Sequence, residues 1–287
     1  MIKIEKIITL NHAQYIEEML KTYRMEDSNS SPTPATEELL GPEHCPTMDK
    51  DKAEMKKLPY RNLIGELLYL AHSSRPDISY SVGVLSRFME NPGKKHWEAA
   101  KRILRYLRGS KDFGLTFNGQ LDNNSENGVY NIQAYSDADW GRDLYGRKSI
   151  FGYIVHLNGC PISWVSKKQT FVSQSTCESE YVGMSEAIRE IRWIYQLLQE
   201  LKIKSNFIEV PTLLGDNVSS IMIASNTRMD NRIKSIDIKY HYIKDEVASK
   251  RVQLQHVASE YNVADIFTKP LNSVKFHNFK NQILGEL

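Results

Sequence analysis

The sequence predicts a mixed α/β fold, with a central mixed sheet flanked by helices and a small helical region before it. Two patterns in the second half of the chain predict the sheet. Strand-like segments joined by short turns come first and favour antiparallel pairing, whereas the strands that follow are separated by helices and favour parallel pairing. Apolar residues at helical spacing dominate the first half. With 287 residues, the chain is long enough for one large domain or two ordinary ones.

The N-terminal residues predict a strand and a helix before a connecting segment. Residues 2–9 alternate enough for a short strand, and residues 12–23 carry one apolar face at helical spacing. The composition then turns to Pro, Ser, Asp and Lys, which can bury little apolar surface. We therefore expect an N-terminal piece at 1–27 and a linker at 28–58.

A compact helical segment is expected at 59–118. Apolar residues cluster at 63–70 and 78–89, and a third helix is predicted at 94–108. The words SSRPD and NPG separate these helices, because Pro and Gly interrupt helical hydrogen bonding.

The helix at 94–108 is apolar on one face and basic on another. A solvated surface is the ordinary interpretation of such a basic face. Clustered Lys and Arg can also bind the phosphates of a nucleic-acid backbone without reading its sequence, and the sequence leaves both interpretations open. The candidate phosphate-binding residues are Lys94, Lys95, Lys101, Arg105 and Arg108.

A polar turn at 119–130 separates this segment from a second region at 129–287, where the sheet is expected. Antiparallel strands come first, followed by a long helix and then by alternating strands and helices. The predicted strands are 131–137, 148–157, 161–166, 170–173, 207–214 and 252–257, and the predicted helices are 176–201, 217–225, 237–249 and a region from about 260.

Several carboxylates lie where a strand ends or a helix begins. Asp137 and Asp139 close the first strand, and spacing alone does not separate them. Ser175 and Glu178 fit a capping box in which the carboxylate returns to the amide of the cap residue, so Glu178 has a structural role. Glu180 could point toward the sheet edge, or it could simply be an acid favoured near a helix N-terminus.

Asp216 and Asp265 complete the set of candidate ligands. Asp216 follows an apolar strand-like run, and Asp265 lies in the word NVADIFTK. Each also fits an ordinary capping or surface role. Because hard divalent cations prefer several carboxylate oxygens, we hypothesise that Asp137, Glu180, Asp216 and Asp265 converge on metal ions.

Composition restricts the class of protein further. A net charge of +2 and 41% hydrophobic residues describe an ordinary globular chain, so any basic surface is local. The three cysteines are widely separated, which gives neither a disulfide framework nor a metal-ligand pair and favours a reducing, intracellular setting. The sequence has no apolar run of membrane-spanning length and no signal-peptide pattern at its N-terminus, so no membrane partner is expected.

Long words of the sequence resemble the ribonuclease H domain of Ty1/copia-type retrotransposon polyproteins. Residues 60–115 resemble the segment before that domain, and residues 8–27 resemble the end of the reverse transcriptase. The words that carry the ribonuclease H resemblance are YSDADW (135–140), RKSIFGYIVHLNGCPISWVSKKQ (147–169), SQSTCESEYVGMSEAIREIRWI (173–194), GDNVSSI (215–221), IDIKYHYIKDEV (236–247) and ADIFTKPL (264–271).

The resemblance implies a ribonuclease H-like fold with a five-stranded mixed sheet, preceded by a connection, thumb-like region. It implies that Asp137, Glu180, Asp216 and Asp265 hold two Mg²⁺ or Mn²⁺ ions, with Asp139 accessory, and that the chain cuts the RNA strand of RNA–DNA hybrids. It also implies an association with the upstream reverse transcriptase part of the polyprotein. The implied location is cytoplasmic, within virus-like particles, or nuclear; the sequence does not indicate an oligomeric state.

The sequence departs from the family pattern at Gly215, Val218 and Ser235, none of which is an implied metal ligand. His256 is the only histidine near the place of a mobile histidine found in many ribonucleases H, and we assign it no role. No YxDD word is present, so we expect a C-terminal fragment of a Pol polyprotein, or a truncated reading frame descended from one, that does not polymerise. An inactive remnant that binds nucleic acid without catalysis is the main alternative, and a host-adopted interaction protein is another.

Overall fold

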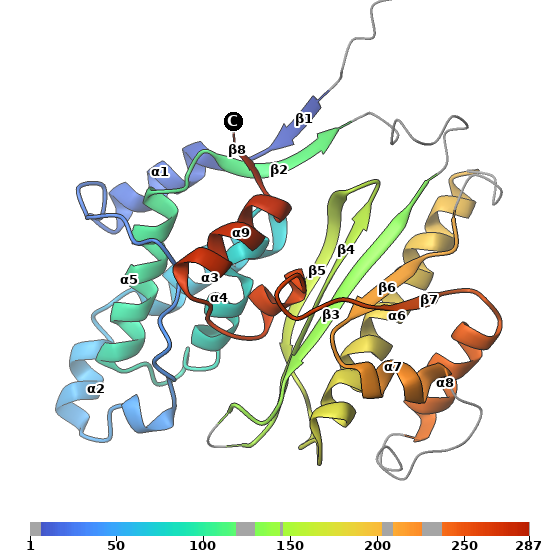
Figure 1. Ribbon diagram of the computed structural model, residues 1–287. Helices are drawn as coiled ribbons and strands as arrows, with labels where there is room; N and C mark the ends of the chain where they lie inside the picture. The colour runs from blue at the N-terminus through green and yellow to red at the C-terminus, as the bar shows by residue number, and fades with distance from the viewer. Residues whose placement is uncertain (1–6, 119–129, 144–145, 203–208, 226–236, 287) are drawn as a thin grey trace, which may run out of the picture. The chain divides into compact units, whose positions relative to one another are not determined.

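The computed structural model describes residues 7–118, 130–143, 146–202, 209–225 and 237–286 (Figure 1). It divides into two compact units. The sheet unit contains residues 117–268 together with the first residues of the chain, and the helical unit contains residues 9–116 and 269–287. Residues 2–6 of the first predicted strand, most of the polar turn at 119–130, the first two residues of the strand predicted at 207–214, and Ser235 lie outside the described residues.

The sheet unit is built on a five-stranded sheet with the strand order β5-β4-β3-β6-β7. β3 to β5 form antiparallel pairs, whereas β6 pairs in parallel with both β3 and β7. This arrangement confirms the predicted mixed sheet. The strands are β3 (Ile132–Asp139), β4 (Ile150–Leu157), β5 (Cys160–Lys168), β6 (Thr212–Gly215) and β7 (Gln253–His256).

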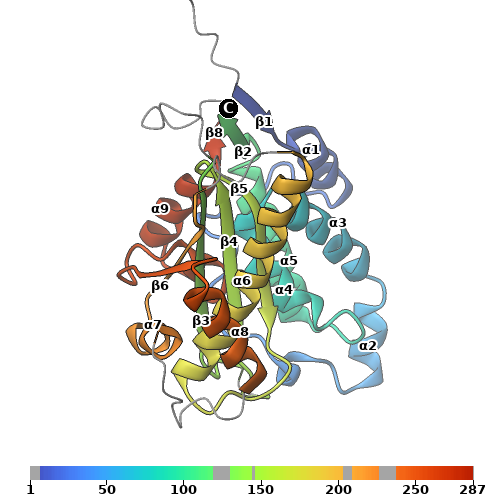
Figure 2. The same ribbon diagram turned by 90° about the vertical axis from the view of Figure 1, so that its right-hand side faces the viewer.

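Helix α6 (Thr176–Glu200) lies across one face of the sheet (Figure 2) and contacts β3, β4 and β6. α7 (Val218–Ser225) and α8 (Asp237–Ala248) pack against α6 and against each other. The apolar stripe of α6 is buried with the inward residues of the strands, and it forms the core of this unit. The core includes Tyr181, Met184, Ile188 and Ile191 of α6.

The short 3₁₀ helix η5 (Val263–Phe267) packs on β3 and β4. Because strand residues alternate between faces, Gly152 and its neighbour Phe151 point to opposite sides of β4. A β-carbon at Gly152 would overlap Phe267 and lie 3.2 Å from Thr268 Cγ2. A glycine is therefore needed for η5 to approach the sheet this closely.

In the helical unit, the three predicted helices α3, α4 and α5 contact one another and bury apolar residues. Arg75 is fully buried, where its guanidinium pairs with both oxygens of Asp77 and donates to the carbonyl of Ser110 at 2.8 Å. Burial alone would lower the pKa of Arg75, but the neighbouring Asp77 raises it above its ordinary value. The helices of this unit are α1 (Ala13–Thr22), η1 (Pro42–His44), α2 (Asp49–Met55), α3 (Tyr60–Ser73), η2 (Pro76–Ile78), α4 (Ser79–Ser86), α5 (Lys94–Arg108) and α9 (Ser273–Ile283).

A small sheet with the order β1-β2-β8 adds strands that were not all predicted. β1 (Ile7–Leu10) ends the predicted N-terminal strand, whereas β2 (Phe113–Asn118) lies in a segment that was expected to be helical. β2 pairs with the last described residues, β8 (Gly285–Glu286). Residues 269–287, which the sequence grouped with the ribonuclease H-like region, thus cluster with the helical unit.

The segment predicted as a linker at 28–58 is packed and partly helical. It contains η1 and α2, and Thr33 within it is buried. The amide of Ser31 donates to the carbonyl of Arg105 at 3.2 Å, and Arg102 donates to the hydroxyl of Thr33 at 3.0 Å. Few apolar residues are needed here, because polar contacts with α5 fix the segment.

The strand predicted at 170–173 is wrong, because this stretch is irregular. Its side chains bond to neighbours in place of a strand ladder. Ser173 donates to the amide oxygen of Gln169 at 2.7 Å, and its carbonyl accepts from the indole of Trp140 at 2.9 Å. The amide nitrogen of Gln169 donates to the carbonyl of Ser179 at 2.9 Å, which joins the segment to α6.

No helix within the described ranges is long and apolar enough to cross a membrane.

Candidate metal centre

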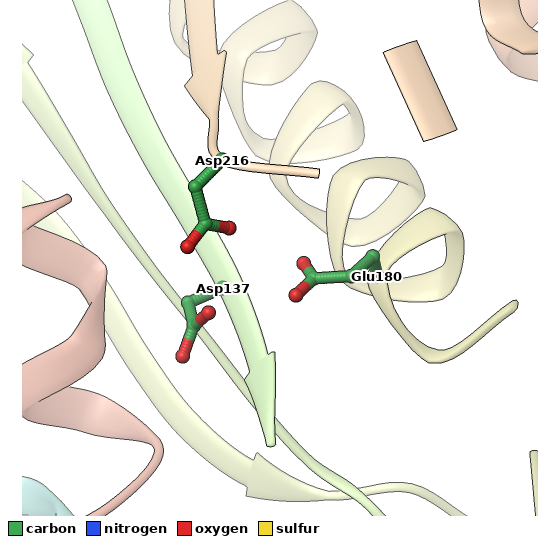
Figure 3. Close-up of side chains that lie close together, drawn as sticks. All are labelled: Asp137, Glu180 and Asp216. Atoms are coloured by element: carbon green, nitrogen blue, oxygen red, sulfur yellow. The ribbon is translucent and has the colours of Figure 1, made fainter. Parts of the chain in front are cut away.

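Two carboxylates lie side by side because of the register of two parallel strands. The pairing of β3 with β6 ends at Tyr135 and Leu214. Asp137 and Asp216 each follow two residues later, so they stand at the same level and on the same face. The carboxyl ends of adjacent parallel strands are a frequent place for ligands in open α/β sheets. Figure 3 shows both side chains directed to the same space.

Helix α6 brings the third carboxylate to this place. A β-carbon at Gly183 would lie only 3.4 Å from the carbonyl oxygen of Asp137, so the helix backbone passes close to β3 there. Glu180 is three residues earlier on the same helix face. Its carboxylate points from α6 toward Asp137 and Asp216 (Figure 3).

The three carboxylates form a compact group of oxygen ligands. One oxygen from each of Asp137, Glu180 and Asp216 lies within 4.8 Å of the others. Asp137 is 3% exposed and Glu180 is 8% exposed. Like charges this close and this buried repel one another unless a cation or a proton is bound between them. Three carboxylate oxygens are also the donors that Mg²⁺ and Mn²⁺ prefer, so the residues present fit such an ion.

Asp265, the fourth predicted ligand, does not belong to this group of three. It lies in η5 and is fully buried. The structure therefore brings three of the four predicted acids together, and it places the fourth on the short helix that packs against β3 and β4.

The neighbouring acids have separate partners. Asp139 lies 3.5 Å from the guanidinium of Arg142. The hydroxyl of Ser175 accepts from the amide of Glu178, as predicted, but the carboxylate of Glu178 accepts from the amide of Gln174 at 2.6 Å. The predicted cap by Ser175 is thus confirmed, and Glu178 has a structural role at the start of α6.

Three polar residues around the carboxylates were not predicted from the sequence. The hydroxyl of Thr268 donates to Asp137, and the hydroxyl of Ser259 donates to Asp216 at 2.6 Å. The side chain of Asn262 donates to the carbonyl of Ser136, which precedes Asp137, at 3.0 Å. These contacts join residues far apart in the chain, so spacing in one sequence gives no signal for them.

The basic residues of α5 lie in the helical unit, and most of them have partners there. Lys95 pairs with Glu38 at 2.5 Å and Lys101 with Glu98 at 2.9 Å. Arg108 donates to the backbone carbonyls of Glu26 and Ser28, so it helps to hold the connecting segment. Arg105 is partly buried, whereas Lys94 and Lys95 are exposed.

Comparison with known proteins places the chain among retrotransposon proteins, although no family model matches it. It is 37% identical over 275 residues to the Retrovirus-related Pol polyprotein from transposon TNT 1-94 of Nicotiana tabacum, a match that covers 96% of this chain and 20% of that protein. It is 40% identical over 231 residues to the corresponding polyprotein from transposon RE2 of Arabidopsis thaliana, covering 79% and 15%. It is 28% identical to the Transposon Ty1-NL2 Gag-Pol polyprotein of Saccharomyces cerevisiae, covering 82% and 13%.

Solved structures of a ribonuclease H and of a viral reverse transcriptase are also similar, at low identity. The metagenomic LC11-RNase H1 is 16% identical, with a TM-score of 0.36, and the match covers 48% of this chain and 92% of that one. A foamy viral protease-reverse transcriptase in complex with RNA/DNA hybrid is 10% identical, with a TM-score of 0.41, covering 74% and 27%. The family assignment is based on the sequence relatives and not on these matches.

The chain spans about a fifth or less of the length of the three polyproteins compared. The matches to the plant polyproteins extend over most of its own residues and therefore include both units. The chain belongs to the family of Ty1/copia-type retrotransposon Pol polyproteins.

Proposed function

We propose that this chain is a metal-dependent endonuclease that cuts the RNA strand of RNA–DNA hybrids, as part of a copia-type reverse transcriptase/ribonuclease H. One observation carries the proposal: carboxylates from β3, α6 and the end of β6 lie with ligand oxygens within 4.8 Å of one another. The mixed sheet and the retrotransposon family support a ribonuclease H-type nuclease role.

Asp137, Glu180 and Asp216 would hold Mg²⁺ or Mn²⁺, and Asp265 remains the proposed additional ligand for a two-ion site. When bound, such ions would activate a water and stabilise the leaving 3′ oxygen. The three carboxylates form one compact group of negative charge. Asp137 and Glu180 belong to a strand and a helix, and Asp216 directly follows a strand; regular elements position side chains more accurately than loops do.

The substrate and the partners are proposed on chemical grounds. Only the 2′-hydroxyl distinguishes RNA from DNA locally, so contacts to that group would select the RNA strand. Lys94, Lys95, Lys101, Arg105 and Arg108 are proposed to hold the backbone of the hybrid. The upstream reverse transcriptase is the proposed protein partner. The proposed location is the cytoplasm, within virus-like particles, or the nucleus.

The cleavage assay uses the full chain with a hybrid labelled on the RNA strand, in the presence of Mg²⁺ or Mn²⁺. We expect cleavage of the RNA strand only, and none of a DNA duplex of the same sequence. Asp137→Asn keeps the size of the side chain and removes its charge, so this variant should cut at background rate. Cleavage by the natural chain no faster than by Asp137→Asn refutes the enzymatic proposal; hybrid binding without cleavage would then indicate an inactive remnant.

The binding proposal is tested where the structure leaves lysines exposed. Lys94→Ala with Lys95→Ala should weaken hybrid binding and reduce the slope of log affinity against log salt by up to about 1.8, because each lost phosphate contact contributes about 0.9. The matched control replaces Lys56 and Lys57, two exposed lysines of the same unit. An equal salt slope in both double variants would indicate that the basic face of α5 is an ordinary solvated surface.

A further inference from the structure

Two hydroxyl groups from one stretch of the chain, residues 257–268 between β7 and α9, contact two of the clustered carboxylates. The hydroxyl of Thr268 donates to Oδ2 of Asp137, and that of Ser259 donates to Oδ2 of Asp216. Asn262 lies between them and is fully buried, and its side chain donates to the backbone next to Asp137. One segment therefore contacts both strand-borne ligands.

We propose that Ser259 and Thr268 are positioning residues, which fix the orientation of the Asp216 and Asp137 carboxylates for metal binding. This inference rests on the proposed metal-dependent function. Without these bonds, each aspartate could turn about its terminal torsion, which is a soft degree of freedom. A hydroxyl bond to one oxygen restricts rotation of the carboxylate plane.

The physical reason for two such bonds is the charge of the group. Three carboxylates with oxygens within 4.8 Å tend to turn away from one another, since rotation increases the distance between like charges. The hydroxyl donors that bond Asp137 and Asp216 oppose this rotation. Groups of this kind orient the ligands of metal sites, and their loss commonly weakens metal affinity by about 10–100-fold.

The different burial of the two hydroxyls separates positioning from folding. Thr268 is fully buried, so its bond could also support the packing of η5. Ser259 is exposed, and the fold does not depend on burying it. A positioning role predicts that removing either hydroxyl weakens metal binding, whereas a purely structural role predicts an effect at Thr268 alone.

The experiment titrates the full chain with Mn²⁺ and follows the free ion by electron paramagnetic resonance, without any substrate. We expect Thr268→Val and Ser259→Ala each to weaken Mn²⁺ binding by about tenfold or more. Thr268→Ser restores the hydroxyl and should bind within a few-fold of the natural chain. Ser225→Ala, which removes an exposed hydroxyl from the end of α7, is the matched control and should leave binding unchanged.

The outcomes separate this inference from the proposed function. If the natural chain binds no Mn²⁺, or if Asp137→Asn binds it equally well, the proposed metal-dependent function fails. If the natural chain binds and either hydroxyl-free variant binds as tightly, the positioning role is refuted. Should Thr268→Val fail to fold, as judged by circular dichroism, the exposed Ser259→Ala variant decides.

Discussion

Removing one charge from the metal centre should stabilise the protein when no metal is bound. Asp137 is nearly buried and lies in a group with Glu180 and Asp216 whose ligand oxygens are within 4.8 Å. Coulomb's law with an effective dielectric constant of about 20 gives a repulsion of about 3.5 kcal/mol for each pair at this separation. Asp137→Asn removes two of these repulsions and keeps the shape of the side chain.

The measured gain will be smaller than this repulsion. Bound protons and solvent relieve part of it in the natural chain. The hydroxyl of Thr268 also loses a charged acceptor, and the change from a charged to a neutral hydrogen bond costs about 1 kcal/mol. We therefore expect Asp137→Asn to raise the free energy of unfolding by about 1–3 kcal/mol without metal.

The assay is urea unfolding followed by circular dichroism, after chelation and again with Mg²⁺. At 100 times its dissociation constant, an ion adds about 2.7 kcal/mol to the natural chain. The free energy of unfolding of Asp137→Asn should rise much less when Mg²⁺ is added. Glu178→Gln is the control, because Glu178 lies in α6 with Glu180 and its carboxylate accepts from the amide of Gln174. Loss of this charge should lower the free energy of unfolding by about 0.5–1 kcal/mol and leave the stabilisation by Mg²⁺ unchanged. An Asp137→Asn chain less stable than the natural one without metal would refute the repulsion.

Three further predictions concern packing, buried charge and pH. Gly152→Ala should lower the free energy of unfolding, measured by thermal unfolding, by about 1–3 kcal/mol, because its β-carbon overlaps Phe267. Gly65→Ala, in open space within α3, should raise it by about 0.5–1 kcal/mol. Equal effects of the two substitutions would contradict the close packing at Gly152. Arg75→Met leaves a buried carboxylate without its cation and should lower urea stability by about 3–5 kcal/mol, and a loss below 1 would contradict this. Burial lowers the pKa of His156 from 6.5 to about 4, so the unfolded chain binds the proton first and stability falls as pH drops through that range. His156→Leu should remove up to about 3 kcal/mol of this change in the free energy of unfolding. If urea unfolding shows the same pH dependence from pH 6.5 to 4 in His156→Leu as in the natural chain, the prediction is refuted.

The elements with strong periodicity could be predicted from the sequence. The long amphipathic stripe of α6 and the alternation in β3 specify a helix and a strand, because their local pattern matches one period clearly. The stretch at 170–173 and the segment at 28–58 could not be predicted in this way. Their conformation depends on side-chain bonds to Trp140, Ser179 and α5, which lie elsewhere in the chain.

The candidate site was partly predictable. The positions of Asp137, Glu180 and Asp216 follow from strand ends and from a helix start. Ordinary structural roles explained Glu180 and Asp216 equally well, however, and spacing alone did not separate Asp137 from Asp139. The resemblance to retrotransposon polyproteins selected them, and the structure brings their oxygens together. Asp265 was selected in the same way, yet it lies outside this group of three.

The sequence by itself determined the local elements and the acids at their ends, because helix and strand periods, caps and turns depend on neighbouring residues. Only the tertiary structure decided that β6 pairs in parallel with β3 in the register that aligns Asp137 with Asp216. It also decided that Thr268 bonds to Asp137 across 131 residues of chain. Register and contacts of this range are set by the packing free energy of the whole sheet and its helices, which no local pattern contains.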